Sequence, residues 1–184
     1  GKTWMAKKLS KQSPKGSIIV AATTGIAAVN LADSDVETTT INSALKYFNT
    51  DDLREKYQTG QLQGILRKHR RSGVRRILID EKAMMNGHQL TYIARAVDEV
   101  NKPRDKSLEA TGTGDDYGDE PEEIQPQIGI TLVGDFGQLP PVPDEDPKTG
   151  RKQPTFFCFD SPEWKRFADH TTTLTKIYRQ DNQA

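Results

Sequence analysis

Residues 130–142 read Ile-Thr-Leu-Val-Gly-Asp-Phe-Gly-Gln-Leu-Pro-Pro-Val, and this stretch decides the fold. Its apolar beginning predicts a strand over 128–133, and the glycines and prolines that follow predict an irregular loop. In open α/β sheets, ligands bind beyond the carboxyl ends of the strands. Gln138 is therefore expected to contact a phosphate or its attacking water. A stiff Pro-Pro turn would explain the prolines, but not the Gly-Asp-x-x-Gln sequence before them.

Two shorter signals upstream suit the same chemistry. The chain opens on Gly1-Lys2-Thr3, at the head of a predicted helix, where Lys2 would supply charge for the β- and γ-phosphates and Thr3 a hydroxyl for Mg²⁺. Residues 77–81 read Ile-Leu-Ile-Asp-Glu. After this apolar strand, Asp80 would hold magnesium through its hydration shell and Glu81 would polarise the attacking water. The tripeptide alone is weak evidence, and an exposed acidic pair at a strand end remains the alternative for the two carboxylates.

Apolar runs alternate with helical patterns along the chain. Strands are expected at 17–22, 76–80, 128–133 and, as a fourth candidate, 172–174. Helical segments are expected at 3–10, 26–31, 41–48, 52–69, 90–97 and after 161. Ser161 is expected to cap the last of these helices, with Pro162 at its first position. This order predicts an α/β domain whose mainly parallel sheet is covered by helices on both faces.

The composition is compatible with one globular domain but does not identify a binding partner. The 184 residues suffice for one domain with a sizeable core, and the zero net charge gives no general reason to expect nucleic acid. Residues 67–76 contain six Lys and Arg in ten positions, most simply a solvated surface. Cys158 is the single cysteine, which excludes an internal disulfide and fits a reducing compartment. No apolar run approaches the length of a membrane span.

Residues 101–127 stand apart from the rest of the chain. They lack apolar periodicity and are rich in Gly, Pro and acids, with seven acids and no Lys or Arg between 109 and 123. Such a segment has little apolar surface to bury, so we expect a disordered or mobile insertion. The chain also begins inside a phosphate-loop sequence, without the preceding G-x-x-x-x or an initiator Met. We therefore expect a fragment of a longer polypeptide.

Several ordered motifs make the chain similar to the first RecA-type domain of a Pif-type superfamily 1B DNA helicase, a 5′-to-3′ ATP-dependent group. The resemblance runs from residue 1 to about 181, with the insertion interrupting it. It implies a RecA-like P-loop NTPase fold. Beside Gly-Lys-Thr, it rests on Thr-Thr-Gly-Ile-Ala-Ala at 23–28, Thr-Ile-Asn-Ser at 40–43, Asp-Glu with Met84 at 80–84, Gly-Asp-x-x-Gln-Leu-Pro-Pro at 134–141, and the closing segments 159–164 and 174–180.

The resemblance implies ATP and Mg²⁺ as cofactors. It assigns the nucleotide site to Gly1, Lys2, Thr3, Asp80, Glu81, Gln138 and Arg179. Lys2 would contact phosphate, and Thr3 with Asp80 would hold magnesium. Glu81 would be the catalytic base and Gln138 the γ-phosphate sensor. Arg179 would reach the γ-phosphate as an arginine finger.

The same resemblance implies contacts with single-stranded DNA. Thr24 and Gly25 would hold a DNA phosphate by hydroxyl and backbone N–H, a contact that carries no sequence information. Thr40 and Asn42 belong to this set too, although helix capping explains them equally well. Aromatic side chains stack on bases in such proteins, but for the candidates, Phe48 and Phe136, burial is the safer prediction.

The sequence departs from the family pattern in two places. Lys82-Ala83 stands where the family has an apolar residue and Ser, which would weaken communication between ATP and DNA, and Asn42 replaces a His. The alternatives are therefore another superfamily 1 motor, such as a recombination-nuclease subunit or a transposon-borne helicase, and a non-catalytic DNA-binding remnant. The intact Lys2, Asp80, Glu81, Gln138 and Arg179 argue against the remnant.

The resemblance predicts an ATP-dependent DNA helicase, with hydrolysis by in-line attack of a water. Two RecA-type domains would close and open to move single-stranded DNA, so a second such domain is expected in the same polypeptide. Expected partners are single-stranded DNA and duplex junctions, with no membrane. Roles in DNA repair, recombination and telomere maintenance are implied by the family alone. The expected location is intracellular: nucleus or mitochondrion in a eukaryote, cytoplasm in a bacterium or phage.

Overall fold

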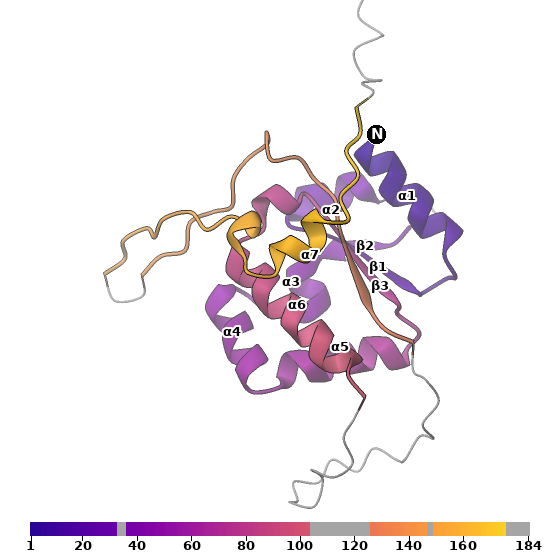
Figure 1. The fold of residues 1–184 in the computed structure, drawn as a ribbon, viewed down its shortest axis with the longest axis horizontal. Coiled ribbons are helices and arrows are strands. Elements are labelled where there is room, and N and C mark those ends of the chain that lie inside the picture. Colours follow the sequence, from indigo (N-terminus) through magenta and orange to yellow (C-terminus); the bar gives the residue numbers. More distant parts are fainter. Residues whose placement is uncertain (33–35, 104–125, 147–148, 176–184) are drawn as a thin grey trace, which may run out of the picture.

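The computed structural model describes residues 1–32, 36–103, 126–146 and 149–175. Its centre is one four-stranded, all-parallel sheet in the order β2-β1-β3-β4 (Figure 1). The strands are β1 (Ile18–Ala22), β2 (Thr38–Thr40), β3 (Arg76–Asp80) and β4 (Gly129–Leu132). The predicted α/β class with a parallel sheet is confirmed.

The register of the sheet brings three strand ends to one edge. Ala22 pairs with Asp80 at the ends of β1 and β3, and Ile79 pairs with Leu132 at the end of β4. The segments that follow these strands therefore begin side by side at the carboxyl edge. This is the edge at which open α/β sheets bind their ligands.

Helices cover both faces of the sheet (Figure 1). They are α1 (Lys2–Gln12), α2 (Gly25–Leu31), α3 (Ile41–Leu45), α4 (Thr50–Gln58), α5 (Gln61–Arg71), α6 (Gly87–Asn101) and α7 (Trp164–Ala168), with short 3₁₀ turns η1 (Lys82–Met84) and η3 (Cys158–Asp160). Within the described part of the chain, no helix is long and apolar enough to cross a membrane.

Alternate residues of the central strand β3 pack into different halves of the core. Ile77 and Ile79 join α3, α4, α5 and α6 in the larger cluster, whereas Leu78 joins α1 and α2 in the smaller one. The periodic face of α6 is buried as its spacing predicted, with Leu90 and Ile93 both at 0% exposure. Because both faces of β3 are covered, an apolar run without alternation forms this strand.

Several predicted elements differ from the structure. The helix expected at 52–69 breaks at Gly60, whose φ of 77° is left-handed, so α4 and α5 form separately. The segment 172–174 is not a strand, and β2 was not predicted. Ser161 accepts a hydrogen bond from the Glu163 N–H (3.2 Å), but this closes a turn, and α7 begins only at Trp164.

The predicted insertion falls mostly outside the described residues, which resume at residue 126 after 103. Its two flanks are joined directly. The Asn101 side chain donates to the Ile128 carbonyl and accepts from the Ile128 N–H, both at 2.9 Å. The end of α6 and the segment leading into β4 are therefore held together at this point.

Candidate nucleotide site

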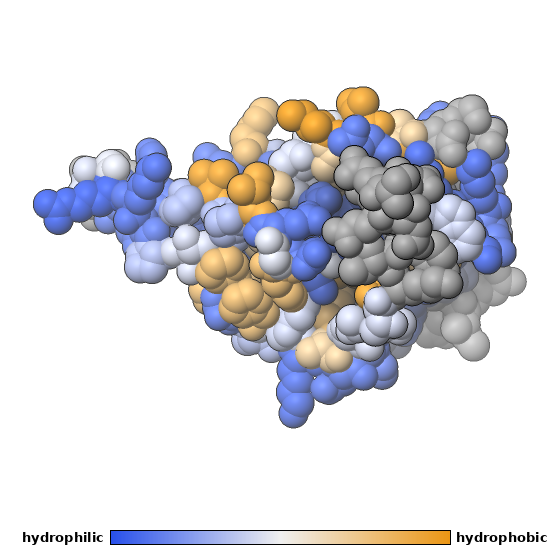
Figure 2. All heavy atoms as spheres, turned by 90° about the horizontal axis from the view of Figure 1, so that it is seen from above, coloured by the Kyte–Doolittle hydropathy of each residue, from blue (hydrophilic) through white to orange (hydrophobic). Residues whose placement is uncertain are grey.

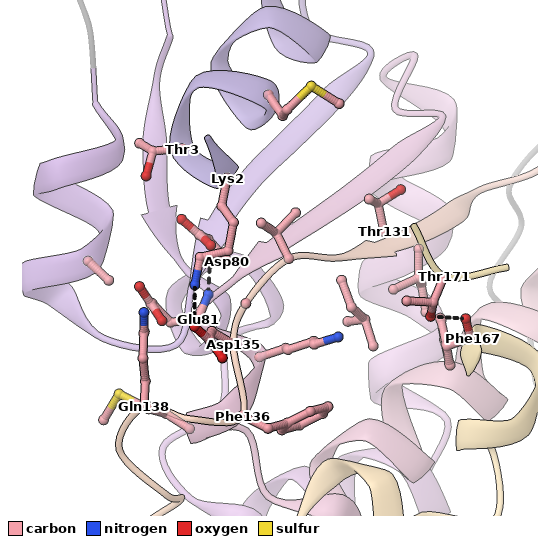
Figure 3. Close-up of a pocket in the computed structure, with 18 of the residues that line it drawn as sticks. Lys2, Thr3, Asp80, Glu81, Thr131, Asp135, Phe136, Gln138, Phe167 and Thr171 are labelled. Atoms are coloured by element: carbon pink, nitrogen blue, oxygen red, sulfur yellow. Dashed lines mark hydrogen bonds and ion pairs between the residues drawn. The ribbon is translucent and has the colours of Figure 1, made fainter. Parts of the chain in front are cut away.

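A cavity lies where the start of α1, the end of β3 and the loop after β4 meet (Figure 3). From there it continues along β4 towards α7 and residues 170–174. Six of the seven predicted nucleotide-site residues line it: Gly1, Lys2, Thr3, Asp80, Glu81 and Gln138. The seventh, Arg179, lies outside the described residues.

Asp80 is the buried acid of the site, with 5% of its surface exposed at the end of β3. Burial raises the pKa of this carboxyl, because desolvation disfavours its charged form. The Glu81 N–H, which donates to Asp80 Oδ1 at 2.9 Å, and the positive charge of Lys2 both act in the opposite direction. A nearby cation would therefore be favourable, as expected of a magnesium-binding carboxylate.

Glu81 has a strained backbone, with φ 56° and ψ 44° in the left-handed region. For a residue other than glycine this costs on the order of 1–3 kcal/mol and requires support from its surroundings. The Thr23 hydroxyl donates to the Glu81 carbonyl at 3.1 Å, and the Lys82 N–H donates to the Val133 carbonyl at 2.9 Å. A Cβ on Gly134 would lie 2.7 Å from the Lys82 nitrogen, so glycine is needed where this turn meets the loop.

The loop after β4 directs Gln138 to Glu81 (Figure 3). When its amide is oriented to satisfy both neighbours, Gln138 Nε2 donates to Glu81 Oε2 at 2.5 Å and its Oε1 accepts from Lys2 Nζ at 3.1 Å. Lys2 Nζ also lies 3.9 Å from Asp135 Oδ2. The same aspartate accepts from the Gly137 N–H at 3.0 Å and so shapes the loop itself. The Gln138 amide is thus within hydrogen-bonding distance of both the Lys2 ammonium and the Glu81 carboxylate.

Asp135 and Lys82 contribute to the site but were not among the predicted site residues. A signal for Asp135 was present in the sequence, since it belongs to the Gly-Asp-x-x-Gln stretch before the prolines. In the sequence, Lys82 stood out only as a departure from the family pattern, because the aromatic rings that it contacts, those of Phe136 and Trp164, lie far from it along the chain.

Two of the four predicted DNA-contacting residues cap helices. Thr24 caps α2 by accepting from the Ala27 N–H (3.2 Å), and Thr40 caps α3 by accepting from the Ser43 N–H (3.2 Å). Asn42 donates its side-chain amide to the Phe48 carbonyl at 3.4 Å. Thr24 lines the nucleotide cavity. Gly25 begins α2 at the same edge, and a DNA contact by all four residues stays a prediction.

The expected burial of phenylalanine is wrong for Phe48, which is 89% exposed. The preceding Tyr47 takes the buried position at 3% exposure, after a left-handed Lys46 ends α3. Burial is also wrong for Phe136, which is 41% exposed although its ring packs edge-on against Phe159 and Trp164, with centroids 5.0 and 5.5 Å away.

Comparison with known proteins agrees with this geometry. The model of the PIF1-like helicase family matches residues 1–184. The ATP-dependent DNA helicase PIF1 of Homo sapiens is 28% identical over 186 residues, which cover 100% of this chain and 24% of that protein. The ATP-dependent DNA helicase RRM3 of Saccharomyces cerevisiae is 30% identical over 176 residues, 96% of this chain and 21% of that protein. The chain thus spans less than a quarter of the length of these relatives.

The fold of this chain is also similar to that of a solved structure. The crystal structure of Pif1 helicase from Bacteroides in complex with ADP-AlF3 and ssDNA is 26% identical, with a TM-score of 0.55, over 100% of this chain and 37% of that one. The family match over the full chain and the all-parallel α/β sheet agree. The chain belongs to the PIF1-like helicase family.

Proposed function

We propose that this chain is the ATP-hydrolysing domain of an ATP-dependent DNA helicase. One observation carries the proposal: Gln138 bridges Glu81 and Lys2 beside the buried carboxylate of Asp80. Cation, base and orienting amide are the parts that phosphoryl transfer to water requires. The relatives named above as ATP-dependent DNA helicases support the same activity.

The side chains present fit magnesium-ATP. Asp80 is a buried carboxylate with a raised pKa, which a cation would stabilise, and the Thr3 hydroxyl lines the same cavity. Lys2 carries its ammonium to the point where the phosphates would lie, at the head of α1. ATP would supply the phosphoanhydride bond that is broken, and Mg²⁺ the charge that neutralises its oxygens. Thr3 and Asp80 would hold the metal, while Gly1 and Lys2 would hold phosphate.

Glu81 would act as the general base in this site. It adopts a left-handed backbone directly after β3, and its carboxylate accepts from the Gln138 amide. Glu81 would accept a proton from the attacking water, and Gln138 would help to orient that water. Arg179 is proposed as the arginine finger on family resemblance alone.

The carboxyl edge also supports a DNA-binding role. Thr24 and Gly25 begin α2 at this edge, and two large exposed apolar side chains line the cavity there, Ile26 (79%) and Leu139 (69%). Figure 2 shows apolar patches separated by hydrophilic surface. Exposed apolar patches of this kind mark interaction sites. Single-stranded DNA, duplex junctions and a second RecA-type domain of the same polypeptide are the partners proposed here, with Thr40 and Asn42 as further DNA contacts.

The biological setting is proposed from the family. PIF1 and RRM3 relatives favour a role in DNA repair, recombination and telomere maintenance, and their human and yeast sources favour the nucleus or mitochondrion. Another superfamily 1 motor remains the second candidate. The organised Lys2–Gln138–Glu81 contacts count against a non-catalytic remnant.

The test is the ATP hydrolysis rate of the intact protein with and without single-stranded DNA. We expect stimulation by DNA and a loss of about 10²–10³-fold in Lys2→Ala, the usual consequence of removing a charge that stabilises the transition state. Lys8→Ala is the matched control, since this exposed lysine lies on the same helix and outside the cavity. A rate that is independent of DNA, or retained in Lys2→Ala, would contradict the proposal.

A further inference from the structure

Lys82 lies over two aromatic rings from different parts of the chain. It follows Glu81 directly and begins η1. Its Nζ is 4.7 Å from the ring centroid of Phe136 and 5.0 Å from that of Trp164. The two rings pack edge-on with centroids 5.5 Å apart. One ammonium thus contacts both the loop after β4 and the first residue of α7.

Both the backbone and the side chain of Lys82 contact the loop that carries Gln138. Its backbone N–H donates to the Val133 carbonyl at 2.9 Å, where the loop begins. Its ammonium meets Phe136, two residues before Gln138. The backbone fixes the start of the loop, and the side chain fixes its middle against a helix. An ammonium over a ring is attracted by the ring quadrupole, more strongly where water is partly excluded.

The surroundings of Lys82 are consistent with such a partly dry contact. Burial lowers the pKa of its ammonium, and the charge of Lys2 acts in the same direction. Asp135 and Cys158 act in the opposite direction. Lys82 also lines the nucleotide cavity. The residue is therefore held in place by two rings and its backbone, rather than extended into solvent.

We propose that Lys82 is a positioning residue for ATP hydrolysis, which clamps Phe136 against Trp164 and thereby holds Gln138 towards Glu81 and Lys2. The inference rests on the proposed function. The family pattern that this chain resembles has an apolar residue at this position, so the cationic clamp is a property of this chain.

The competing explanation is that the lysine stem only fills space against the rings. Lys82→Met distinguishes this space-filling explanation from the cationic clamp, because methionine keeps an unbranched apolar stem and removes the charge. Lys82→Arg keeps a cation that stacks on aromatic rings. Lys165→Met is the matched control, since Lys165 is exposed and adjacent to Trp164 in sequence.

The first measurement is steady-state ATP hydrolysis by the intact protein. We expect Lys82→Met to lower kcat about tenfold, equivalent to roughly 1.4 kcal/mol of barrier, with KM changed by less than about twofold. Lys82→Arg should restore kcat to within about threefold of the wild type. Wild-type kcat in Lys82→Met, or a raised KM at unchanged kcat, would overturn the proposal.

The second measurement does not depend on activity. Of the two tryptophans in the sequence, Trp4 is exposed, so Trp4→Phe leaves Trp164 as the sole tryptophan of the 184-residue chain, and its emission is recorded with excitation selective for tryptophan over tyrosine. We expect Lys82→Met to change Trp164 emission, whereas Lys82→Arg and Lys165→Met leave it close to the parent spectrum. Unchanged emission in Lys82→Met would overturn the clamp. Absence of ATP hydrolysis in the wild-type protein would instead refute the proposed function, and the emission result would still decide the clamp.

Discussion

Glu81→Gln removes the proposed base with the least disturbance of the structure. The substitution exchanges one carboxylate oxygen for an amide nitrogen and leaves the side-chain length unchanged. The left-handed turn at Glu81 is supported by the Thr23 hydroxyl and by the close approach of Gly134, neither of which involves the carboxylate. The Gln138 amide, which donates to Glu81 Oε2 at 2.5 Å, would then face a second amide. We expect the fold to persist while the proton acceptor is lost.

The expected loss follows from the role of the residue. A positioned general base typically contributes about 10²–10⁴-fold in rate, or roughly 2.7–5.4 kcal/mol of barrier. Because Lys2, Thr3 and Asp80 remain to hold phosphate and metal, ATP binding should stay nearly intact. The substitution should therefore separate binding from turnover.

The assay is single-turnover hydrolysis at saturating ATP in the intact protein, with affinity measured by a fluorescent ATP analogue. Glu55→Gln makes the same chemical change at an exposed position of α4 and is the matched control. A hydrolysis rate within about threefold of wild type, or roughly 0.7 kcal/mol, would remove Glu81 from the mechanism.

Three further predictions follow from the geometry. Burial raises the pKa of Asp80, so the folded protein binds its proton more readily than the unfolded chain, and stability falls as pH rises between the unfolded and folded pKa values. Asp80→Asn should therefore raise the Tm at a pH above that window, while abolishing magnesium-dependent hydrolysis; a lower Tm there would contradict the assignment of burial as the dominant effect. Gly134→Ala places a Cβ 2.7 Å from neighbouring backbone and should lower the free energy of unfolding, measured in urea, by about 1–3 kcal/mol. The control Gly137→Ala, whose closest contact would be 3.4 Å, should lower it less, and equal losses would refute this prediction. Deletion of residues 105–125 should leave the free energy of unfolding and DNA affinity nearly unchanged, whereas tighter DNA binding with a steeper salt dependence would show that its acids shield the basic run at 67–76.

The sheet and the position of the site were predictable for a simple physical reason. Strands buried on both faces require uninterrupted apolar runs, and residues 18–22 and 77–79 supply them. The carboxyl ends of parallel strands meet at one edge, so chemistry-bearing residues directly after two such strands had to converge. Asp80, Glu81 and Gln138 were located in this way.

The remaining elements depend on tertiary context. β2 consists of three partly exposed threonines, Thr38–Thr40, too short and polar to show a strand pattern. The break between α4 and α5 required knowing that Gly60 adopts a left-handed conformation rather than only weakening a helix. Phe48 is exposed because Tyr47 occupies the core, and only the Lys46 turn decides which of these two adjacent aromatics is buried.

Details of the site depend on contacts between distant segments. The strained backbone of Glu81 is supported by Thr23 and by the loop at Gly134, which lie 58 and 53 positions away. The contact of Lys82 with Trp164 spans a still longer stretch of the chain. Local sequence patterns carry no signal for such pairs. Such contacts can be identified only once the strands are paired in the folded structure.

We propose that residues 1–184 hydrolyse ATP as one domain of a DNA motor that has a second RecA-type domain. A strand-separation assay on a 5′-tailed duplex tests it most directly, with the intact protein and the 184-residue chain compared under magnesium-ATP. The account predicts that the intact protein unwinds the duplex, that Glu81→Gln abolishes unwinding, and that the 184-residue chain alone does not unwind. Robust unwinding by the 184-residue chain, or by the intact Glu81→Gln protein, would contradict it.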